Sequence, residues 1–201
     1  MTATDKFVII PKATAKKTKK KIADVLNVEL IEATLADSSL IGIFSFGNSK
    51  GIVVPKLVEQ HEVDYLNSIG IKVLQIDSNL ALGNLAEAND KVGFCNILAK
   101  KQIEEIEKFL GIKIYNQQIA NSDLIGASLV LTNKAFAVNP NTNANEFKRI
   151  QTKTSLEGKV LTANFGDVFI AHSLVANSNG VLVGEATTGP EIMQIYDLFG
   201  E

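Results

Sequence analysis

Two side chains in this chain of 201 residues could together perform covalent chemistry, Cys95 and His172. A thiolate beside an imidazole is a nucleophile with its general base, so the pair would suit nucleophilic catalysis. The chain has a single cysteine and one further histidine, His61, which leaves too few ligands for a Cys/His zinc cluster and no partner for an internal disulfide. We therefore expect no metal, no cofactor and no disulfide.

The composition favours a globular protein that binds another protein. With 46% hydrophobic residues the chain can bury a sizeable core. The net charge is −2 and the pI is about 5.8, whereas proteins that bind nucleic acid over a wide surface carry an excess of Lys and Arg. No apolar run approaches the roughly 18 to 20 residues that cross a bilayer, and the N-terminus lacks the order of a signal peptide. We expect a cytoplasmic protein with no membrane contact.

One segment departs from this charge balance. Lysines recur from Lys12 to Lys21, just before Ile22, Val25 and Leu26, whose spacing is typical of one apolar helix stripe. The lysines would cover the other faces of an amphipathic helix. A solvated helix face is the simpler interpretation, and a contact with RNA phosphates is the alternative.

The elements that would position these residues recur along the chain. Thr4, Asn48, Asn89, Asn133 and Asn177 each begin a polar turn, at steps of 44, 41, 44 and 44 residues. Such a period is typical of propellers and repeat arrays. Asn, Asp and Gly in these turns tolerate positive φ, which favours tight turns between antiparallel strands.

Each turn is followed by the same pattern. Seven positions after the five turn starts lie Pro11, Pro55, Asn96, Pro140 and Gly184. Proline cannot donate to a strand ladder, so it ends the second strand. Helical spacing then predicts five helices, over Ile22–Leu26, Val63–Ile69, Ile103–Leu110, Phe147–Ile150 and Ile192–Phe199. Further strands are predicted at Val28–Ile31, Ile71–Leu74 and Ile112–Tyr115. The repeat unit is strand, turn, strand, helix, strand.

Five such units are best arranged as a closed ring. If the sheets face a common centre, the helices pack outside them and bury their apolar stripes against the sheets. Closing the ring also removes the unpaired strand edges that an open row would have. No linker or low-complexity tract divides the chain. We expect one α/β domain over residues 1–201. Its last helix begins at Thr188, because Glu191 lies at the spacing of a capping box.

Several phrases, in this order and spacing, resemble the archaeal-type translation initiation factor 6 family. They are Ser39–Gly42, Asn48–Lys56, Leu80–Asn84, Leu131–Lys134, Val175–Gly180 and Thr187–Glu191. The resemblance extends over nearly the whole chain. It implies the family's fold, a five-bladed β/α propeller of the pentein class.

The same resemblance implies a function. Members of the family bind the large ribosomal subunit as monomers, chiefly through an L14-type ribosomal protein near the sarcin-ricin loop, and so prevent premature pairing with the small subunit. Blocking of this kind needs only an interface of about 1,200 to 2,000 Å² at the right place. A mildly acidic chain would suit a basic ribosomal protein.

The resemblance also implies ribosome-binding residues. Asn84 closes an Ala-Leu-Gly-Asn phrase whose Asn lies on the ribosome-facing surface in the family. The alternative is that this amide bonds the backbone of its own turn. The positions five before the other turn starts are Ile43, Ser128 and His172, and we expect them to share the same face. For His172 the alternative is a solvated or locally bonded histidine.

In one respect the sequence departs from the family. Family members begin with further residues that supply the closing strand of the last blade and the first strand of blade one, whereas here Thr4 already lies at the first turn. Both strands are therefore expected to be missing, and the first blade to be truncated.

Two rival functions remain open. Pentein folds also include enzymes that modify guanidino groups through a cysteine and a histidine, which would use Cys95 and His172. Against this, Cys95 occupies a repeat position that is mostly apolar, so a buried core residue is favoured and we expect no enzyme. The other units have Ile10, Val54, Asn139 and Val183 there. The other rival is a repeat-built binding module with a different partner.

Overall fold

The computed structural model describes residues 1–200, which form a mixed α/β fold of five small β-sheets, eight α-helices and one 3-10 helix. The first unit contains β1 (Thr2–Ala3), β2 (Phe7–Pro11), α1 (Lys16–Leu26) and β3 (Glu29–Ala33). The second contains α2 (Ile41–Phe44), β4 (Phe46–Asn48), β5 (Gly51–Pro55), α3 (Gln60–Ser68) and β6 (Val73–Ile76). The third contains α4 (Leu82–Leu85), β7 (Ala86–Ala88), β8 (Val92–Cys95), α5 (Lys100–Leu110) and β9 (Lys113–Tyr115).

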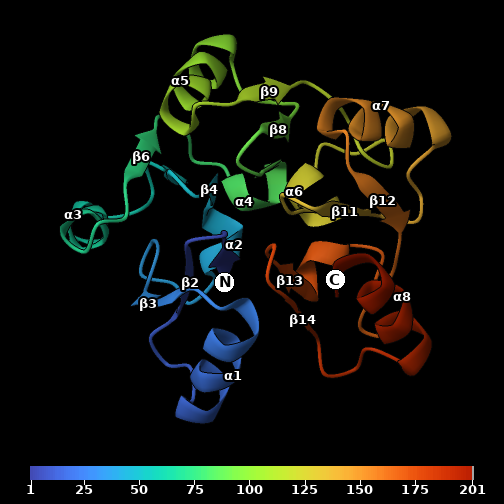
Figure 1. Ribbon diagram of the computed structural model, residues 1–201. Helices are drawn as coiled ribbons and strands as arrows, with labels where there is room; N and C mark the ends of the chain where they lie inside the picture. Colours follow the sequence, from blue (N-terminus) through green and yellow to red (C-terminus); the bar gives the residue numbers. More distant parts are fainter. Residues whose placement is uncertain (201) are drawn as a thin grey trace.

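The remaining units follow the same plan. The fourth contains α6 (Ile125–Ser128), β10 (Leu129–Leu131), β11 (Ala135–Val138), α7 (Ala144–Thr154) and β12 (Glu157–Val160). The fifth contains the 3-10 helix η1 (Ile170–His172), β13 (Leu174–Ala176), β14 (Val181–Val183) and α8 (Gly189–Phe199). The units lie around a common centre, with the five long helices outside the strands (Figure 1).

The sheets share one topology with one exception. In the first four, the middle strand pairs antiparallel with the strand before it and parallel with the strand after it. In the fifth, β14 pairs only with β13 among the described strands. The expectation that the first unit lacks its first strand is wrong, because Thr2 and Ala3 pair with Ile9 and Val8 as β1. Two paired residues suffice for a strand here because the turn fixes their register.

The turns are built by one device. The first residue of each turn accepts hydrogen bonds through its side chain from the N–H groups two or three positions later. Asn89 does so with its amide oxygen at 2.9 Å, and Thr132 with its hydroxyl at 3.2 and 3.0 Å. The predicted turn start at Asn133 is therefore wrong by one residue. A threonine hydroxyl replaces the Asx carbonyl as the turn acceptor.

The same residues join neighbouring units. The Asn48 amide donates to the Asn89 carbonyl at 3.3 Å, and the Asn89 amide donates to the Thr132 carbonyl at 2.8 Å. The Asn177 amide donates to the Thr4 carbonyl at 3.0 Å, which connects the last unit to the first.

The core is divided among the junctions between units. Each of five buried clusters combines strands of one unit with strands and a helix of the next. The cluster around Val8, Ile10 and Ile22 takes in Val175 and Leu182, so it lies between the first and fifth units. Each long helix therefore buries its stripe against its own sheet and a neighbouring one.

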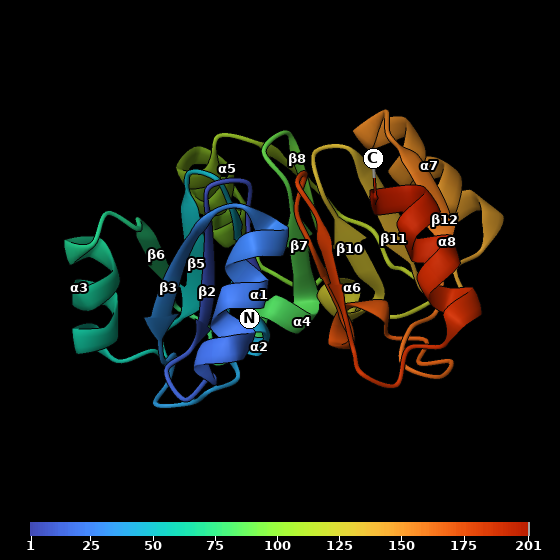
Figure 2. The ribbon, with the colours of Figure 1, turned by 60° about the horizontal axis from the view of Figure 1, so that its bottom comes forward.

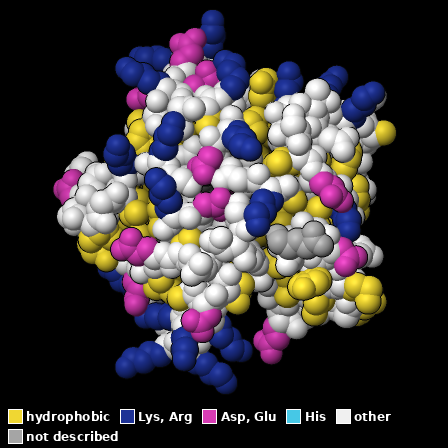
Figure 3. Space-filling view, in the orientation of Figure 1, with side chains coloured by type: hydrophobic (Ala, Val, Ile, Leu, Met, Phe, Trp, Pro, Cys, Tyr) yellow, Lys and Arg dark blue, Asp and Glu magenta, His cyan; other side chains and the backbone are white. Residues whose placement is uncertain are grey.

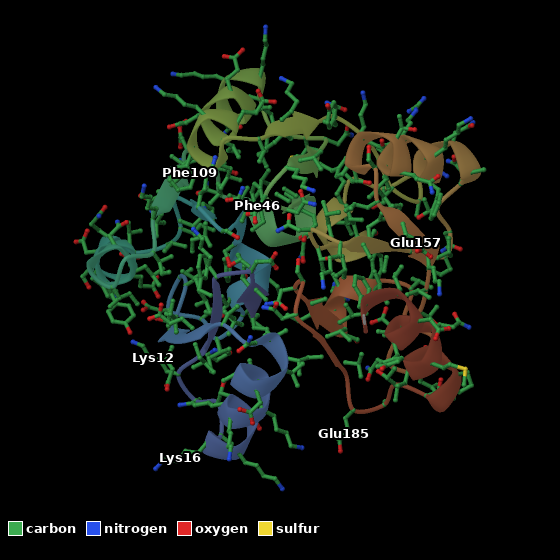
Figure 4. All side chains as sticks on the ribbon, in the orientation of Figure 1. Lys12, Lys16, Phe46, Phe109, Glu157 and Glu185 are labelled. Carbon is green, nitrogen blue, oxygen red and sulfur yellow. The ribbon has the colours of Figure 1, made fainter. Side chains whose placement is uncertain are left out.

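The predicted helices are all present, but not every apolar position is buried. Ile22, Leu66, Ile106, Ile150 and Ile195 are buried as expected. Other positions in the same stripes are exposed, namely Val25, Ile69, Ile192 and Tyr196. The lysine-rich helix α1 lies at the outer edge of the molecule, where Lys16 points outward (Figure 4), and Lys19 pairs with Glu32 at 2.7 Å. Lys12, which precedes α1, is exposed with its amino group 5.8 Å from the centre of the Tyr65 ring. These positions fit a solvated face.

Three of the long helices carry a glutamate that holds both the helix start and a distant loop, namely Glu62, Glu146 and Glu191. Each completes a capping box and also accepts backbone N–H bonds from a left-handed turn. Glu62, for example, accepts from Ala36 at 2.7 Å and Asp37 at 3.2 Å. Non-glycine residues in this backbone region are strained, so these carboxylates offset that strain.

The Glu191 carboxylate is the most strongly bonded of the three. Burial alone would raise its pKa, but N–H groups of Thr188 and Gly166 and the hydroxyls of Thr162 and Thr188 outweigh that effect and lower the pKa to about 2. A folded-state pKa below the ordinary 4.5 stabilises the fold above that pH. This stabilisation is lost as the pH falls from about 4.5 through about 2.

We expect Glu191→Gln to lower the free energy of unfolding by about 2 kcal/mol at pH 7, because an amide NH₂ would face N–H donors. The difference from wild type should shrink as the pH falls toward 2. Urea unfolding at pH 7, 4 and 3 measures this. Glu185→Gln is the matched control, since Glu185 is exposed and should show no effect. An equal loss at pH 7 and pH 3 would contradict the assignment.

Candidate binding face

Four short helical turns meet at the centre of the molecule, α2, α4, α6 and η1. Consecutive turns pack against each other through glycines. A Cβ at Gly83 would overlap the Gly42 carbonyl oxygen, and a Cβ at Gly126 would overlap the Gly83 carbonyl oxygen. In the fourth turn the equivalent residue is Ala171, and this turn is a 3-10 helix. Each short helix precedes the first strand of its hairpin, so all four lie at the end of the strands opposite the hairpin turns (Figure 2). We call this end the helical-turn face.

The helical-turn face is hollowed by a cavity of about 510 Å³. Three of the four predicted site residues line it, Asn84, Ile43 and His172. The amino-terminal Met1 and the side chain of Glu87 also contribute to the wall. The repeat therefore brings equivalent positions of different units to one central hollow.

Asn84 is half-buried at the wall of this cavity. Its backbone N–H bonds the Ala81 carbonyl at 3.0 Å, as the helical turn requires. Its side-chain amide makes no hydrogen bond to any of residues 1–200. The side-chain amide therefore does not bond the backbone of its own turn, which was the alternative interpretation. Both its NH₂ donor and its oxygen acceptor are available to a partner.

Ser128 does not belong to this set. Its side chain is fully buried and its hydroxyl has no hydrogen-bond partner within residues 1–200. The prediction was one position too far along the chain, because the fourth turn starts at Thr132 and the position equivalent to Asn84 is Ala127. A buried hydroxyl cannot contact a partner at the surface, so we do not carry Ser128 into the proposed interface.

His172 and Ile43 both line the hollow. The His172 side chain is 49% exposed, with Nδ1 3.9 Å from the Asp167 carboxylate and its ring 5.3 Å from that of Phe169. Ile43 is half-buried. Both are accessible from the cavity, and His172 is also locally packed.

Glu87 gives the cavity an unusual ionisation. Burial raises the pKa of its carboxyl to about 8, although a backbone hydrogen bond at Leu131 opposes part of that shift. Burial also lowers the pKa of the Met1 amino group. Both groups are therefore biased toward their neutral forms, and below about pH 8 the Glu87 carboxyl can donate a hydrogen bond.

Three exposed leucines lie at the helical-turn face. Leu40, Leu80 and Leu124 lie just before α2, α4 and α6, with exposed fractions of 54%, 42% and 38%. Sequence reasoning missed them because nothing in their spacing separates an exposed leucine from a core one. The sequence signal that could have identified them is their position just before the short Gly-containing turns.

Cys95 does not form a catalytic pair. It is buried in the cluster between the second and third units, and burial raises the pKa of its thiol, which opposes formation of the thiolate. His172, in contrast, faces the central cavity. Asp37, His61 and Glu62 also come together, but the Glu62 carboxylate already accepts three backbone N–H bonds and is structural.

The fold and this face define a repeat-built α/β protein whose distinctive site is an open surface with a polar amide and several exposed leucines. Cys95 and His172 form no catalytic pair there. A model described as the eIF-6 family matches residues 1–198. The chain belongs to the eIF-6 family.

Individual relatives agree with this membership. Translation initiation factor 6 of Saccharolobus islandicus (strain L.S.2.15 / Lassen #1) is 37% identical over 205 residues, which cover 98% of this chain and 91% of the relative. The proteins of the same name from Thermococcus onnurineus and Pyrococcus horikoshii are 32% and 34% identical, and in each case 91% of the relative is covered, with 99% and 98% of this chain. Within residues 1–200, no helix has the length and apolar character needed to traverse a membrane.

Proposed function

We propose that this protein is a translation initiation factor that binds the large ribosomal subunit and prevents its premature association with the small subunit. Membership of a family whose relatives are named translation initiation factor 6 supports this. The mechanism is steric exclusion by a stably bound monomer in the cytoplasm, and it requires no reaction. The partner on the subunit is an L14-type ribosomal protein next to the sarcin-ricin loop.

We further infer that the five units form a closed five-bladed β/α propeller. The core cluster between the first and fifth units supports closure, as does the bond from the Asn177 amide to the Thr4 carbonyl. A closed ring would present the four helical turns as one rigid face. Rigidity matters because a preformed interface loses less conformational entropy on binding.

The helical-turn face is the docking surface in this proposal. The observation that carries it is the Asn84 amide, which has no hydrogen-bond partner within residues 1–200 and lies at a hollow that Leu40 also lines. Leu80 and Leu124 are exposed just before the neighbouring turns α4 and α6. Protein interfaces place a few well-packed anchors and satisfied polar groups inside a water-excluding rim. Exposed leucines suit a protein partner better than a phosphate backbone.

We expect Asn84→Arg to weaken binding to purified large subunits by at least about tenfold, since a central interface residue that is enlarged and charged costs roughly 2 kcal/mol or more. Co-sedimentation over a range of concentrations gives the affinity. Gln151→Arg on the exposed side of α7 makes the same kind of change on the outside of the molecule and should bind normally. Thermal unfolding of both variants should match wild type.

Two results would count against the proposal at different levels. Normal binding by Asn84→Arg would place the docking surface elsewhere on the molecule. Wild-type protein that neither sediments with large subunits nor lowers the yield of joined ribosomes would remove the function itself.

A further inference from the structure

The opposite end of the strands carries a second ordered surface, formed by the five hairpin turns. The residues at the second position of these turns are Asp5, Ser49, Asp90, Asn133 and Ser178. They bond one another across units: Ser49 donates to Asp90 at 2.8 Å through both its N–H and its hydroxyl, and Ser178 donates to Asp5 at 2.8 and 2.7 Å in the same way. We call this surface the hairpin-tip face.

One amide connects the two acidic residues at the centre of this face. Asn133 donates at 2.7 Å to the carboxylates of both Asp5 and Asp90, and its carbonyl oxygen accepts from the Asp90 N–H at 3.0 Å. All five turns are thereby held on one side of the molecule in fixed positions. Side chains at the next position of each turn are consequently displayed in a defined ring.

That next position is occupied by lysine in four of the five turns: Lys6, Lys50, Lys91 and Lys134, with Asn179 in the fifth. All five are exposed. The turn itself requires only the backbone N–H of this residue, which bonds the first turn residue. Asn179 meets that requirement without a charge, so turn geometry does not explain the recurrence of lysine.

Lys6, Lys50 and Lys91 make no salt bridge within residues 1–200, and the central carboxylates are bonded by hydroxyl, amide and N–H groups instead. Lys50 lies beside Gly111 at the C-terminal end of α5. Figure 3 looks onto this face and shows Lys and Arg side chains standing around acidic ones near the centre.

We propose that the hairpin-tip face binds the phosphate backbone of RNA. Lysine is a compact point charge suited to phosphate, and the lysines come from separate turns, so an extended chain of phosphates can meet several of them at once. The two central carboxylates repel a single phosphate placed on the axis of the ring, which favours an extended polyanion over a small free anion. The choice of RNA over other polyanions rests on the proposed ribosomal function.

The proposed contact is independent of base sequence. The ring positions carry no aromatic side chain for base stacking, so affinity should come from counterion release and depend steeply on salt. The net charge of −2 means that RNA binding is not expected from overall attraction. Any binding must therefore come from a local cluster of positive charge.

The test is fluorescence anisotropy with a labelled RNA hairpin at 50 to 200 mM salt. The variant carries Lys6→Gln, Lys50→Gln and Lys91→Gln, the three ring lysines that make no salt bridge within residues 1–200. We expect at least about tenfold weaker binding than wild type at low salt, and a slope of log affinity against log salt that is smaller by about three, roughly one for each lysine.

The matched control removes three lysines from α1 instead, with Lys16→Gln, Lys17→Gln and Lys20→Gln, for the same change in net charge. We expect it to bind RNA as wild type does. An equal loss in both triple variants, or no RNA binding by wild type at 50 mM salt, would overturn the proposal. Thermal unfolding of the two variants shows that both are folded.

The outcome is separable from the proposed docking on the large subunit. Asn84→Arg should retain RNA-hairpin binding, because it changes the opposite face. If wild type fails to sediment with large subunits but RNA binding still depends on the tip lysines, only the ribosomal function fails. If wild type sediments with large subunits but RNA binding does not depend on the lysines of the hairpin-tip face, only the RNA contact is rejected.

Discussion

Gly83→Ala is expected to prevent stable folding, with a loss of more than about 4 kcal/mol in the free energy of unfolding. An added Cβ would overlap the Gly42 carbonyl oxygen and lie 2.7 Å from that of Ser45. Both are backbone atoms of the preceding unit, so no flexible side chain can move aside. Alanine is intrinsically better than glycine in a helical turn by about 1 kcal/mol, so a large loss must come from the clash.

The fourth turn provides the control for this prediction. Ala171 holds the place that Gly83 and Gly126 hold in their turns, and Ala171→Gly should cost only about 0.5 to 1 kcal/mol through added backbone freedom. Urea unfolding of the two variants gives the comparison. A Gly83→Ala protein within 1 kcal/mol of wild type would show that the turns can separate without loss of the fold.

Asn177→Ala should lower the free energy of unfolding by about 3 kcal/mol. Asn177 is buried, and its amide donates to the Thr4 carbonyl at 3.0 Å and the Leu26 carbonyl at 2.8 Å. Its oxygen accepts from the N–H groups of Asn179 and Gly180 at 2.9 and 3.1 Å. Alanine leaves three backbone groups without this partner, since the Leu26 carbonyl keeps a bond from the Asn179 amide at 3.0 Å. Each unsatisfied buried group costs about 1 kcal/mol or more.

The location of the destabilised segments is as informative as the loss in free energy of unfolding. Amide hydrogen exchange should quicken in α1 and β14, which adjoin Asn177, and stay near wild type in α5. Asn177→Asp separates the two functions of the side chain, since it keeps the acceptor oxygen but places a carboxylate against two carbonyls. Asn116→Ala, which removes one exposed bond of 3.3 Å, is the control for loss of an amide. Faster exchange spread evenly over all units would contradict a local closing role.

The long elements could be predicted from sequence because each carries a repeated signal. Helix α5 has four apolar positions at helical spacing, Pro11 and Pro55 end β2 and β5, and Glu191 completes the predicted capping box. The helical turns at the centre could not be predicted in this way. A four-residue helix such as α4 is too short to show a period, and its position depends on contacts with neighbouring units.

The candidate site was predicted less completely than the fold. Asn84 came from a family phrase, and the structure adds that it lines the cavity and that its amide has no hydrogen-bond partner within residues 1–200. Ser128 was misplaced because Thr132 and Asn133 are both good turn formers, and only the hydrogen bonds distinguish them. Ile192 and Tyr196 match a helix stripe yet are exposed, since periodicity does not show where the neighbouring unit ends.

The division of the core among five junctions determines how this protein can assemble. A fragment that comprises one unit would keep a sheet and a helix but only half of each hydrophobic cluster that buries them. No single unit should therefore be stable as an isolated fragment. In a linear repeat array, structure can spread outward from one end at little cost. Here the first and last units share a cluster, so a large part of the stability is gained only when residues far apart in the chain meet. Folding should therefore be strongly cooperative and limited by that late encounter.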